Sequence, residues 1–259
     1  MSKERSRPGD SALSEEQVMI NYAHRGASSY YPENTMSSFR AALDMGANGI
    51  ETDVHETSDG VLVLFHDDTL DRVTDANGDI TKYTFQQLTA IRVFSKDQRC
   101  TDRIASLSEF LNEFSSKSIR FAIELKQAGT EKKVIDVLEK YDMRNKATLT
   151  SFSFDTLKAA RAYNPCYRIG YLYGEKEKDV IAKMHSIGGE ELCPCASLIK
   201  SSADTMKLRR EGFGVRVWGV KDEDTMKRMC LANVDGMTVN FPDRLAAYLR
   251  EVNDEIHGS

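Results

Sequence analysis

The feature that most constrains the fold is a strict alternation between short apolar runs and amphipathic segments with helical periodicity. The apolar runs are bounded by turn residues, which is typical of buried β-strands. They fall at 19–24, 49–55, 119–125, 147–151, 168–173, 191–194, 215–220 and 236–239. The predicted helices fall at 34–45, 107–117, 130–141, 154–163, 177–187, 201–211, 222–232 and 242–252. Strict alternation indicates a parallel sheet, and eight strands close a (β/α)8 TIM barrel.

The length of the chain agrees with one barrel and little else. A barrel of this kind occupies about 200 to 250 residues as one domain, and the chain has 259. We therefore predict a polar N-terminal tail over 1–17, a barrel over 18–252 and a C-terminal tail over 253–259. One stretch, 67–105, is too long for a simple connection, so we expect an inserted lobe after the second strand, with a short helix near 84–91. A doubly wound open sheet is the alternative, but no glycine-rich dinucleotide or Walker loop supports it.

Composition excludes several functional classes. The 35 Lys and Arg residues and 40 Asp and Glu residues give a net charge of −5 with both signs interspersed, unlike a nucleic-acid-binding protein. The five cysteines are scattered, so we expect reduced core thiols rather than a zinc site. The apolar runs are far shorter than the roughly 20 residues of a membrane span, and the first residues lack a secretory signal's apolar region. We therefore expect a cytoplasmic protein with no stable membrane association.

Carboxylates gather on the second and third predicted strands. Glu51, Asp53 and His55 follow one another at intervals of two, so they share one face of a strand. Glu124 and Lys126 share a face at the end of the third strand. Buried carboxylates repel one another unless a cation joins them. Oxygen ligands alone favour Mg²⁺ or Ca²⁺, so we predict one divalent cation held by Glu51, Asp53 and Glu124.

Two histidines end apolar runs, where the reactive groups of a barrel collect. His24 ends the first run, with Arg25 directly after it. A two-residue Asp59-Gly60 hairpin loop would place His66 opposite Asp53. Three carboxylates with one divalent cation leave a charge of −1, and Arg25 with Lys126 changes it to +1. That charge matches one phosphodiester monoanion, for which Arg and Lys are suitable ligands.

Several short motifs, taken together and in order, resemble the glycerophosphodiester phosphodiesterase family. The resemblance spans about residues 19 to 250. It rests on His24-Arg25-Gly26, Pro32-Glu33-Asn34-Thr35, Gly46-Ala47-Asn48, Ile50-Glu51-Thr52-Asp53-Val54, Thr57 with Asp59-Gly60, His66-Asp67, Ile123-Glu124-Leu125-Lys126, Trp218 and Asn240-Phe241-Pro242-Asp243.

The resemblance implies a (β/α)8 barrel that hydrolyses glycerophosphodiesters to sn-glycerol 3-phosphate and an alcohol. It implies a general acid/base pair of His24 and His66, with attack by the neighbouring glycerol hydroxyl through a cyclic phosphate. The same comparison makes Glu51, Asp53 and Glu124 metal ligands and makes Arg25 and Lys126 phosphate contacts. The chain departs from the family in having Gly219-Val220-Lys221 after Trp218, where Thr-Val-Asn is usual, and Met237-Thr238-Val239 near the last strand. Those departures bear on the alcohol that the enzyme prefers.

Aromatic residues at predicted strand ends could form an apolar wall for the substrate, either for its glycerol or for its headgroup. They are Trp218, Tyr171, Tyr173, Phe152 and Phe154; for all but Trp218, packing at the barrel rim is an equal alternative.

The sequence also bears on three rival functions. A metallohydrolase of the amidohydrolase type needs a His-x-His pair on the first strand, whereas Arg25-Gly26 follows His24. A lysophospholipid-directed phosphodiesterase on the same barrel would act at lipid surfaces, and the chain has no basic amphipathic segment to bind one. A non-catalytic phosphate-ligand binding protein would not need both histidines and all three carboxylates. The oligomeric state does not follow from the sequence.

Overall fold

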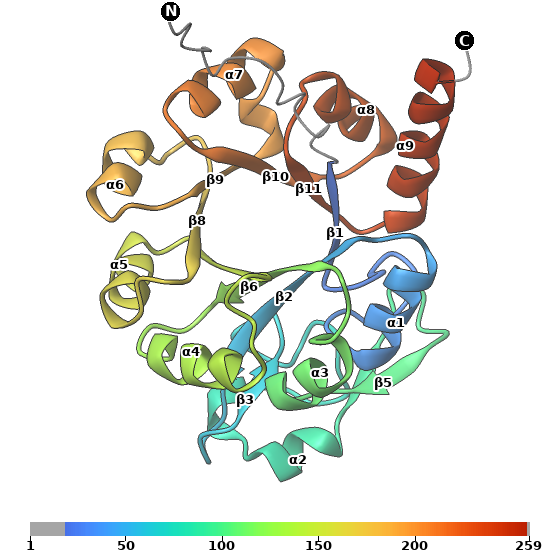
Figure 1. Ribbon diagram of the computed structural model, residues 1–259. Helices are drawn as coiled ribbons and strands as arrows, with labels where there is room; N and C mark the ends of the chain where they lie inside the picture. Colours follow the sequence, from blue (N-terminus) through green and yellow to red (C-terminus); the bar gives the residue numbers. More distant parts are fainter. Residues whose placement is uncertain (1–18, 258–259) are drawn as a thin grey trace, which may run out of the picture.

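A computed structural model describes residues 19–257, and the predicted polar tail at 1–17 lies outside this range. Within this range, eight parallel strands form a closed barrel (Figure 1). They are β1 (Ile20–His24), β2 (Gly49–Glu56), β6 (Arg120–Leu125), β7 (Ala147–Ser151), β8 (Arg168–Tyr173), β9 (Glu191–Pro194), β10 (Gly214–Val220) and β11 (Gly236–Val239). They follow one another round the barrel in chain order, and β1 pairs with both β11 and β2, which closes the ring. The predicted (β/α)8 barrel is confirmed.

Helices surround the barrel on its outside (Figure 1). They are α1 (Met36–Asp44), α3 (Leu107–Phe114), α4 (Glu131–Lys140), α5 (Phe154–Tyr163), α6 (Val180–Ser186), α7 (Ser202–Arg210), α8 (Glu223–Leu231) and α9 (Pro242–His257). Local sequence sets their starts: the Thr35 hydroxyl accepts from the Ser38 amide at α1, and Ser106 with Glu109 forms a capping box at α3. The last helix reaches His257, so most of the stretch predicted as a C-terminal tail is helical.

The main core lies between the barrel and its helices. Phe39, Phe110, Phe114 and Phe121 pack there edge-on or tilted, with ring centroids 4.7–6.1 Å apart. Strand residues of the opposite parity point into the barrel instead. The interior is unusually polar: among its buried residues are Glu51, Asp53, Glu124, Thr150, Glu191, Arg216 and Thr238.

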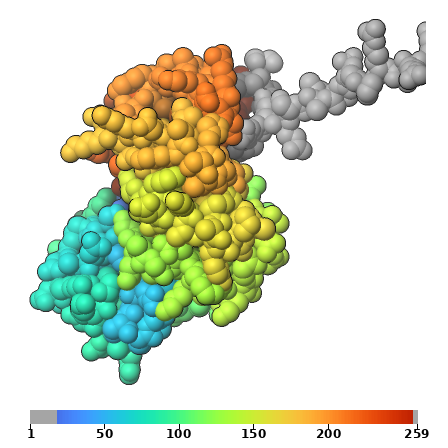
Figure 2. All heavy atoms as spheres, turned by 90° about the vertical axis from the view of Figure 1, so that its left-hand side faces the viewer, coloured from blue at the N-terminus to red at the C-terminus, as the bar shows by residue number. Residues whose placement is uncertain are grey.

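The insertion between β2 and α3 forms the expected lobe. It contains β3 (Leu62–Leu64), a 3-10 turn η1 (Ile80–Lys82), α2 (Phe85–Thr89), and the hairpin of β4 (Arg92–Phe94) with β5 (Thr101–Arg103). A small apolar core of its own holds it together, with Leu70, Ile80 and Leu88 fully buried. In Figure 2 the lobe is the cyan and teal mass on one side of the green and yellow helices.

The predicted hairpin register between β2 and β3 is wrong by one residue. His55 lies opposite Val63 and Val54 opposite Leu64. The Thr57 amide donates to the Val61 carbonyl, so the loop has three residues and ends at Gly60, whose φ is +81°. A three-residue loop with a left-handed glycine is the next commonest hairpin after the two-residue type. Asp53 therefore lies beside Phe65, whose amide donates to its carbonyl, and not directly opposite His66.

The five cysteines are all free, as expected. Only Cys193 is fully buried, however, and Cys166 is exposed, so the prediction that all five are core thiols is wrong. No helix among residues 19–257 is both long enough and apolar enough to cross a membrane.

Candidate active site

Three carboxylates meet inside the barrel near the carboxyl ends of β2 and β6. Parallel pairing sets Asp53 beside Glu124, and Glu51 lies beside His24 on β1. One oxygen from each of Glu51, Asp53 and Glu124 lies within 4.8 Å of the others, and all three side chains are buried. Asp53 Oδ2 accepts a hydrogen bond of 2.9 Å from Asn34, whereas Asp53 Oδ1 is buried with no hydrogen-bond partner. An orphaned buried oxygen among three carboxylates fits a cation site.

The electrostatics of the cluster agree with this interpretation. Burial, followed by repulsion from Asp53 and Glu124, raises the pKa of Glu51 well above its usual range. Burial and the charge of Asp53 raise the pKa of Glu124 to about 7. Burial also disfavours charge on Asp53, but the cations Arg25 and Lys126 hold its pKa below the usual value. Two of the three carboxylates thus lack sufficient positive charge, which a divalent cation would supply.

Arg25 and Lys126 are the predicted phosphate ligands, and both lie against the carboxylates. Arg25 Nε lies 3.3 Å from Asp53 and its NH1 lies 2.8 Å from Glu33. Lys126 Nζ lies 2.9 Å from Glu124 and 3.9 Å from Asp53. Both charges therefore lie at the carboxylates, where an anionic ligand of a bound cation would meet them.

Both predicted histidines are held in one orientation through their Nδ1 atoms. His24 Nδ1 lies 2.6 Å from the Asn240 Oδ1, and His66 Nδ1 lies 2.6 Å from the Asp67 Oδ1. Because these oxygens accept, each Nδ1 carries the proton and each Nε2 is left to act on a ligand. Burial, with a smaller contribution from Arg25, lowers the pKa of His24 to about 4. Both imidazoles line the same cavity.

The loop after β1 brings Arg25 to the site at some conformational cost. Arg25 has φ +57° and Gly26 φ +79°, and the left-handed region is unfavourable for residues with a Cβ. A Cβ at Gly26 would lie 2.6 Å from the Ser38 backbone, so only glycine fits. The backbone amide of Arg25 donates to both the carbonyl and the side chain of Glu51, which holds the strained loop against the carboxylates.

Sequence reasoning missed an ion-pair network that joins the lobe to the site. Arg72 of the lobe donates to Glu33 at 2.6 and 3.0 Å and to Asp67 at 2.5 Å. Glu33 in turn binds Arg25, and Asp67 binds His66. In the sequence, Glu33 and Asp67 stand out only as members of motifs, which indicate no role for either residue. Arg72 carried no signal, because exposed arginines are common in loops.

Arg216 is the second missed residue. It lies 1% exposed on the floor of the cavity, where its Nε is 3.2 Å from Glu191 and its NH1 donates to Thr238 at 3.0 Å. A signal was present: Val215 and Val217 face the helices, so residue 216 must face the barrel interior.

The cavity has a volume of about 290 Å³ and is lined by both histidines, Arg25, Glu51, Glu124 and Trp218. Phe152 stands edge-on to Trp218, with ring centroids 5.1 Å apart, and the two form one wall. Among the other aromatic residues predicted for this wall, Tyr171 is buried in the core outside the barrel and Phe154 packs against it. Tyr173 is also largely buried, but it lines a neighbouring cavity together with Phe152 and Trp218.

The glycine that follows Trp218 in this chain, Gly219, has a local structural explanation. The pairing of β10 with β11 shifts register between Val217 and Val220, and Gly219 has φ +73°. Such a bulge favours glycine and redirects the neighbouring side chain. Trp218 is fixed by a hydrogen bond of 3.2 Å from its Nε1 to the Tyr173 carbonyl.

Comparisons with known proteins all point to one family. Residues 24–244 match the model of the glycerophosphoryl diester phosphodiesterase family. A glycerophosphodiester phosphodiesterase from Caldanaerobacter subterraneus is 30% identical over 240 residues, covering 88% of this chain and 97% of that protein. One from Bacillus altitudinis is 31% identical over 243 residues, covering 89% and 97%.

Solved structures share the fold. The glycerophosphodiester phosphodiesterase from Agrobacterium tumefaciens aligns with a TM-score of 0.79 at 24% identity, over 89% of this chain and 100% of that one. A phosphodiesterase from Oleispira antarctica, solved in complex with its product sn-glycerol-3-phosphate, aligns with a TM-score of 0.79 at 23% identity, over 90% and 97%.

Proposed function

Because the chain belongs to the glycerophosphoryl diester phosphodiesterase family, we propose that it hydrolyses glycerophosphodiesters to sn-glycerol 3-phosphate and an alcohol at the cavity between His24 and His66. The family makes the chain a phosphodiesterase. The observation that carries the assignment of the site is the cluster of three buried carboxylates, with Arg25 and Lys126 against it, beside a cavity lined by both imidazoles.

Glu51, Asp53 and Glu124 would hold one divalent cation, for which their oxygen donors suit Mg²⁺ and Ca²⁺ equally. When bound, such an ion stabilises negative charge on phosphoryl oxygens and favours deprotonation of a nearby hydroxyl. Arg25 and Lys126, released from the carboxylates that the ion then neutralises, would bind the phosphate oxygens.

The two imidazoles would move the protons. With Nδ1 fixed by Asn240 and by Asp67, each presents Nε2 to the substrate. In the first step, one Nε2 accepts a proton from the attacking hydroxyl, which on the family pattern is the neighbouring glycerol hydroxyl, and the other protonates the departing alkoxide, leaving a cyclic phosphate. In the second step the imidazoles exchange roles: water adds to phosphorus, the ring P–O bond breaks, and the glycerol hydroxyl is restored to give sn-glycerol 3-phosphate. Glu33 and Arg72 would keep Arg25 and Asp67 in place while this occurs.

A neighbouring cavity suggests where the alcohol is bound. It has a volume of about 440 Å³ and shares Phe152, Leu172 and Trp218 with the catalytic cavity. Glu175 and Glu177 also line it, with Lys176 as the one cation among its lining residues. Aromatic faces beside a carboxylate favour a cationic group such as choline or ethanolamine, so we propose a cationic alcohol here. An apolar wall also accommodates a short acyl chain, which is the specific observation in favour of a lysophospholipid as second candidate.

The assay is the hydrolysis of glycerophosphocholine, with both possible product pairs quantified. We expect sn-glycerol 3-phosphate and choline, at a kcat/KM above that for lysophosphatidylcholine. Trp218→Ala should raise KM for glycerophosphocholine about fivefold, the scale of one cation–π contact, and should leave KM for glycerophosphoglycerol unchanged. Release of phosphocholine and glycerol would contradict the proposed bond cleavage, and a preference for the lysophospholipid would favour the second candidate.

The cytoplasmic location expected from the sequence stays a prediction.

A further inference from the structure

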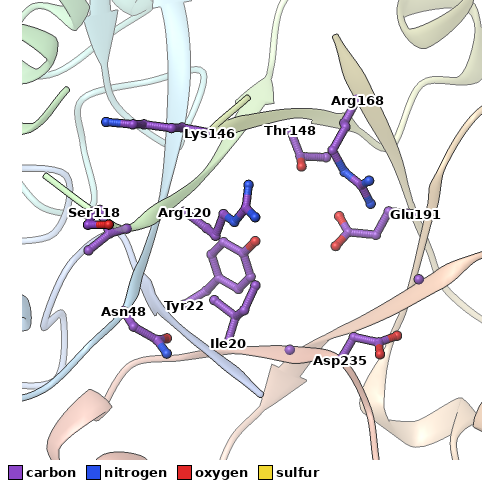
Figure 3. A pocket seen from close by; sticks show the side chains of 13 residues that line it. Ile20, Tyr22, Asn48, Ser118, Arg120, Lys146, Thr148, Arg168, Glu191 and Asp235 are labelled. Carbon is purple, nitrogen blue, oxygen red and sulfur yellow. The ribbon is translucent and has the colours of Figure 1, made fainter. Parts of the chain in front are cut away.

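A second cavity, of about 550 Å³, opens at the end of the barrel opposite the carboxylates. Its walls include Ile20, Arg120, Arg168 and Glu191, each the first residue of its strand, whereas His24 is the last residue of β1. Figure 3 shows Arg120 and Arg168 reaching toward the middle of this space from two sides, and the Tyr22 hydroxyl also points into it.

Within the part of the chain that the structure describes, the arginines at this cavity lack ionic partners. Among residues 19–257, neither Arg120 nor Arg168 forms an ion pair, and the Arg168 guanidinium donates no hydrogen bond. Arg120 NH1 donates only to the backbone carbonyl of Asn145, at 2.5 Å. Lys146 adds a third charge at the rim, where its ammonium binds the carbonyls of Ser115 and Lys117 and points away from the centre (Figure 3).

The two carboxylates of the cavity already have partners of their own. Glu191 lies 3.2 Å from Arg216, and Asp235 lies 2.6 Å from Arg209. Both ion pairs are neutral, so the three remaining cations, Arg120, Arg168 and Lys146, leave a net charge of +3 at the cavity and its rim. Glu191 still points toward the centre (Figure 3), so the anion must lie nearer the two free arginines than that carboxylate.

The hydroxyl of a largely buried tyrosine gives independent evidence for a ligand. Tyr22 is only 4% exposed, yet its hydroxyl makes no hydrogen bond to any described residue and points into the cavity (Figure 3). Burial, with the charge of Glu191, raises the pKa of Tyr22, so the group stays a donor at neutral pH. Thr148, 6% exposed, lines the same wall with a second hydroxyl. Both hydroxyls are therefore available to donate a hydrogen bond to a molecule in the cavity.

We propose that this cavity is a second, non-catalytic site that binds a phosphate dianion, either free or as a small phosphate monoester. Two guanidinium forks and two hydroxyls are suitable donors for phosphate oxygens. A dianion matches the excess of positive charge better than a single carboxylate does. The volume exceeds that of phosphate itself, which leaves room for a small organic group. The Arg216–Glu191 pair separates the two cavities, since Arg216 lines one and Glu191 the other.

Equilibrium dialysis with labelled inorganic phosphate tests this site apart from the catalytic one. It is done in EDTA with Lys126→Gln protein, which weakens phosphate binding in the catalytic cavity. We expect one phosphate per chain. Adding Arg168→Gln or Arg120→Gln should weaken binding at least tenfold, the scale of losing a charged hydrogen bond, and adding Tyr22→Phe should weaken it a few-fold. Arg99→Gln is the matched control, because Arg99 is 85% exposed on the lobe and lines neither cavity.

AMP serves as the second probe. Tighter binding of AMP than of phosphate would identify the ligand as an organic phosphate, and equal binding would identify it as free phosphate. Absence of binding at millimolar phosphate, or binding that Arg168→Gln leaves unchanged, would overturn the proposal. Arg168→Gln with otherwise natural sequence should keep glycerophosphodiester turnover within twofold, so failure here does not depend on the catalytic assignment.

Discussion

At the scale of single residues, the proposed catalytic cavity joins groups that are each costly to bury alone. Three carboxylates repel one another there, and Arg25 has a left-handed backbone. Neighbouring groups compensate in part. Asn34 donates a hydrogen bond to Asp53, which also lies beside the cations of Arg25 and Lys126. Asn240 and Asp67 hold the two imidazoles. Local strain and unsatisfied charge concentrate where function is expected.

His24→Ala and His66→Ala should each lower kcat for glycerophosphocholine at least about a hundredfold, the usual scale of losing an acid or base. KM should change little, because neither imidazole is needed to bind the phosphate. His185→Ala is the control, since His185 is half exposed on α6. A fall in kcat of less than tenfold in both variants would remove the histidines from the proton transfers.

Glu33 makes stability depend on pH. Although burial acts to raise it, the pKa of Glu33 is held down to about 2 by hydrogen bonds and charge from Arg72 and Arg25. A lowered folded-state pKa stabilises the protein above the unfolded value of 4.5, and this contribution is lost as pH falls toward 2. The shift corresponds to about 3 kcal/mol.

Glu33→Gln should therefore unfold more easily than the natural protein at pH 7, and the difference should shrink by more than half at pH 3. Guanidinium unfolding in EDTA at both pH values measures the difference in the free energy of unfolding between the two proteins. An equal difference in the free energy of unfolding at pH 7 and pH 3 would show that the charge of Glu33 contributes nothing.

At the scale of elements, the strands were predictable because each is an apolar run bounded by turn residues. β6, expected at 119–125, is observed at Arg120–Leu125. The register between β2 and β3 was not predictable, because Ser58-Asp59-Gly60 fits both a two-residue and a three-residue hairpin loop. The three-residue loop places Thr57 where its hydroxyl donates to Asp59 and accepts from the Val61 amide. Side-chain hydrogen bonds of this kind decide loop length and are not visible as a sequence pattern.

The part of the site that lies on strands was predictable, because alternate residues of one strand share a face. Glu51, Asp53 and Glu124 meet as expected because strand parity and the parallel pairing of β2 with β6 fix them. Contacts between residues far apart in the sequence could not be predicted. Asn240 and His24 are 216 positions apart, and Arg72 and Glu33 are 39 positions apart. Such pairs depend on how the closed barrel brings its loops together.

The lobe should act on catalysis through Arg72. Arg72→Met removes its bonds to Glu33 and Asp67, so Arg25 and His66 lose their supports. We expect kcat to fall about tenfold, in keeping with loss of a positioning group, and the Arg72→Lys variant to recover part of it. Arg92→Met is the control, because Arg92 pairs only with Asp75 within the lobe. Equal kcat in both methionine variants would show that the lobe does not support the site.

At the scale of the whole molecule, the barrel separates two cavities by a polar interior. The carboxylate end holds the proposed catalytic cavity, partly walled by the inserted lobe through His66, and the opposite end holds the arginine-lined cavity. The net charge of −5 therefore conceals two positive regions: the cavity beside β6 and β8, and the catalytic cavity once a cation is bound. Reactive groups at the carboxyl ends of strands are the rule for this fold.

The central claim, that a cation held by three carboxylates is needed for glycerophosphodiester hydrolysis, is tested most directly by metal depletion. Protein treated with EDTA and dialysed is assayed on glycerophosphocholine before and after adding Mg²⁺ or Ca²⁺, beside Glu51→Ala. We predict no release of sn-glycerol 3-phosphate after depletion, recovery with one of the two ions, and no recovery in Glu51→Ala. Full activity in the depleted protein would contradict the account.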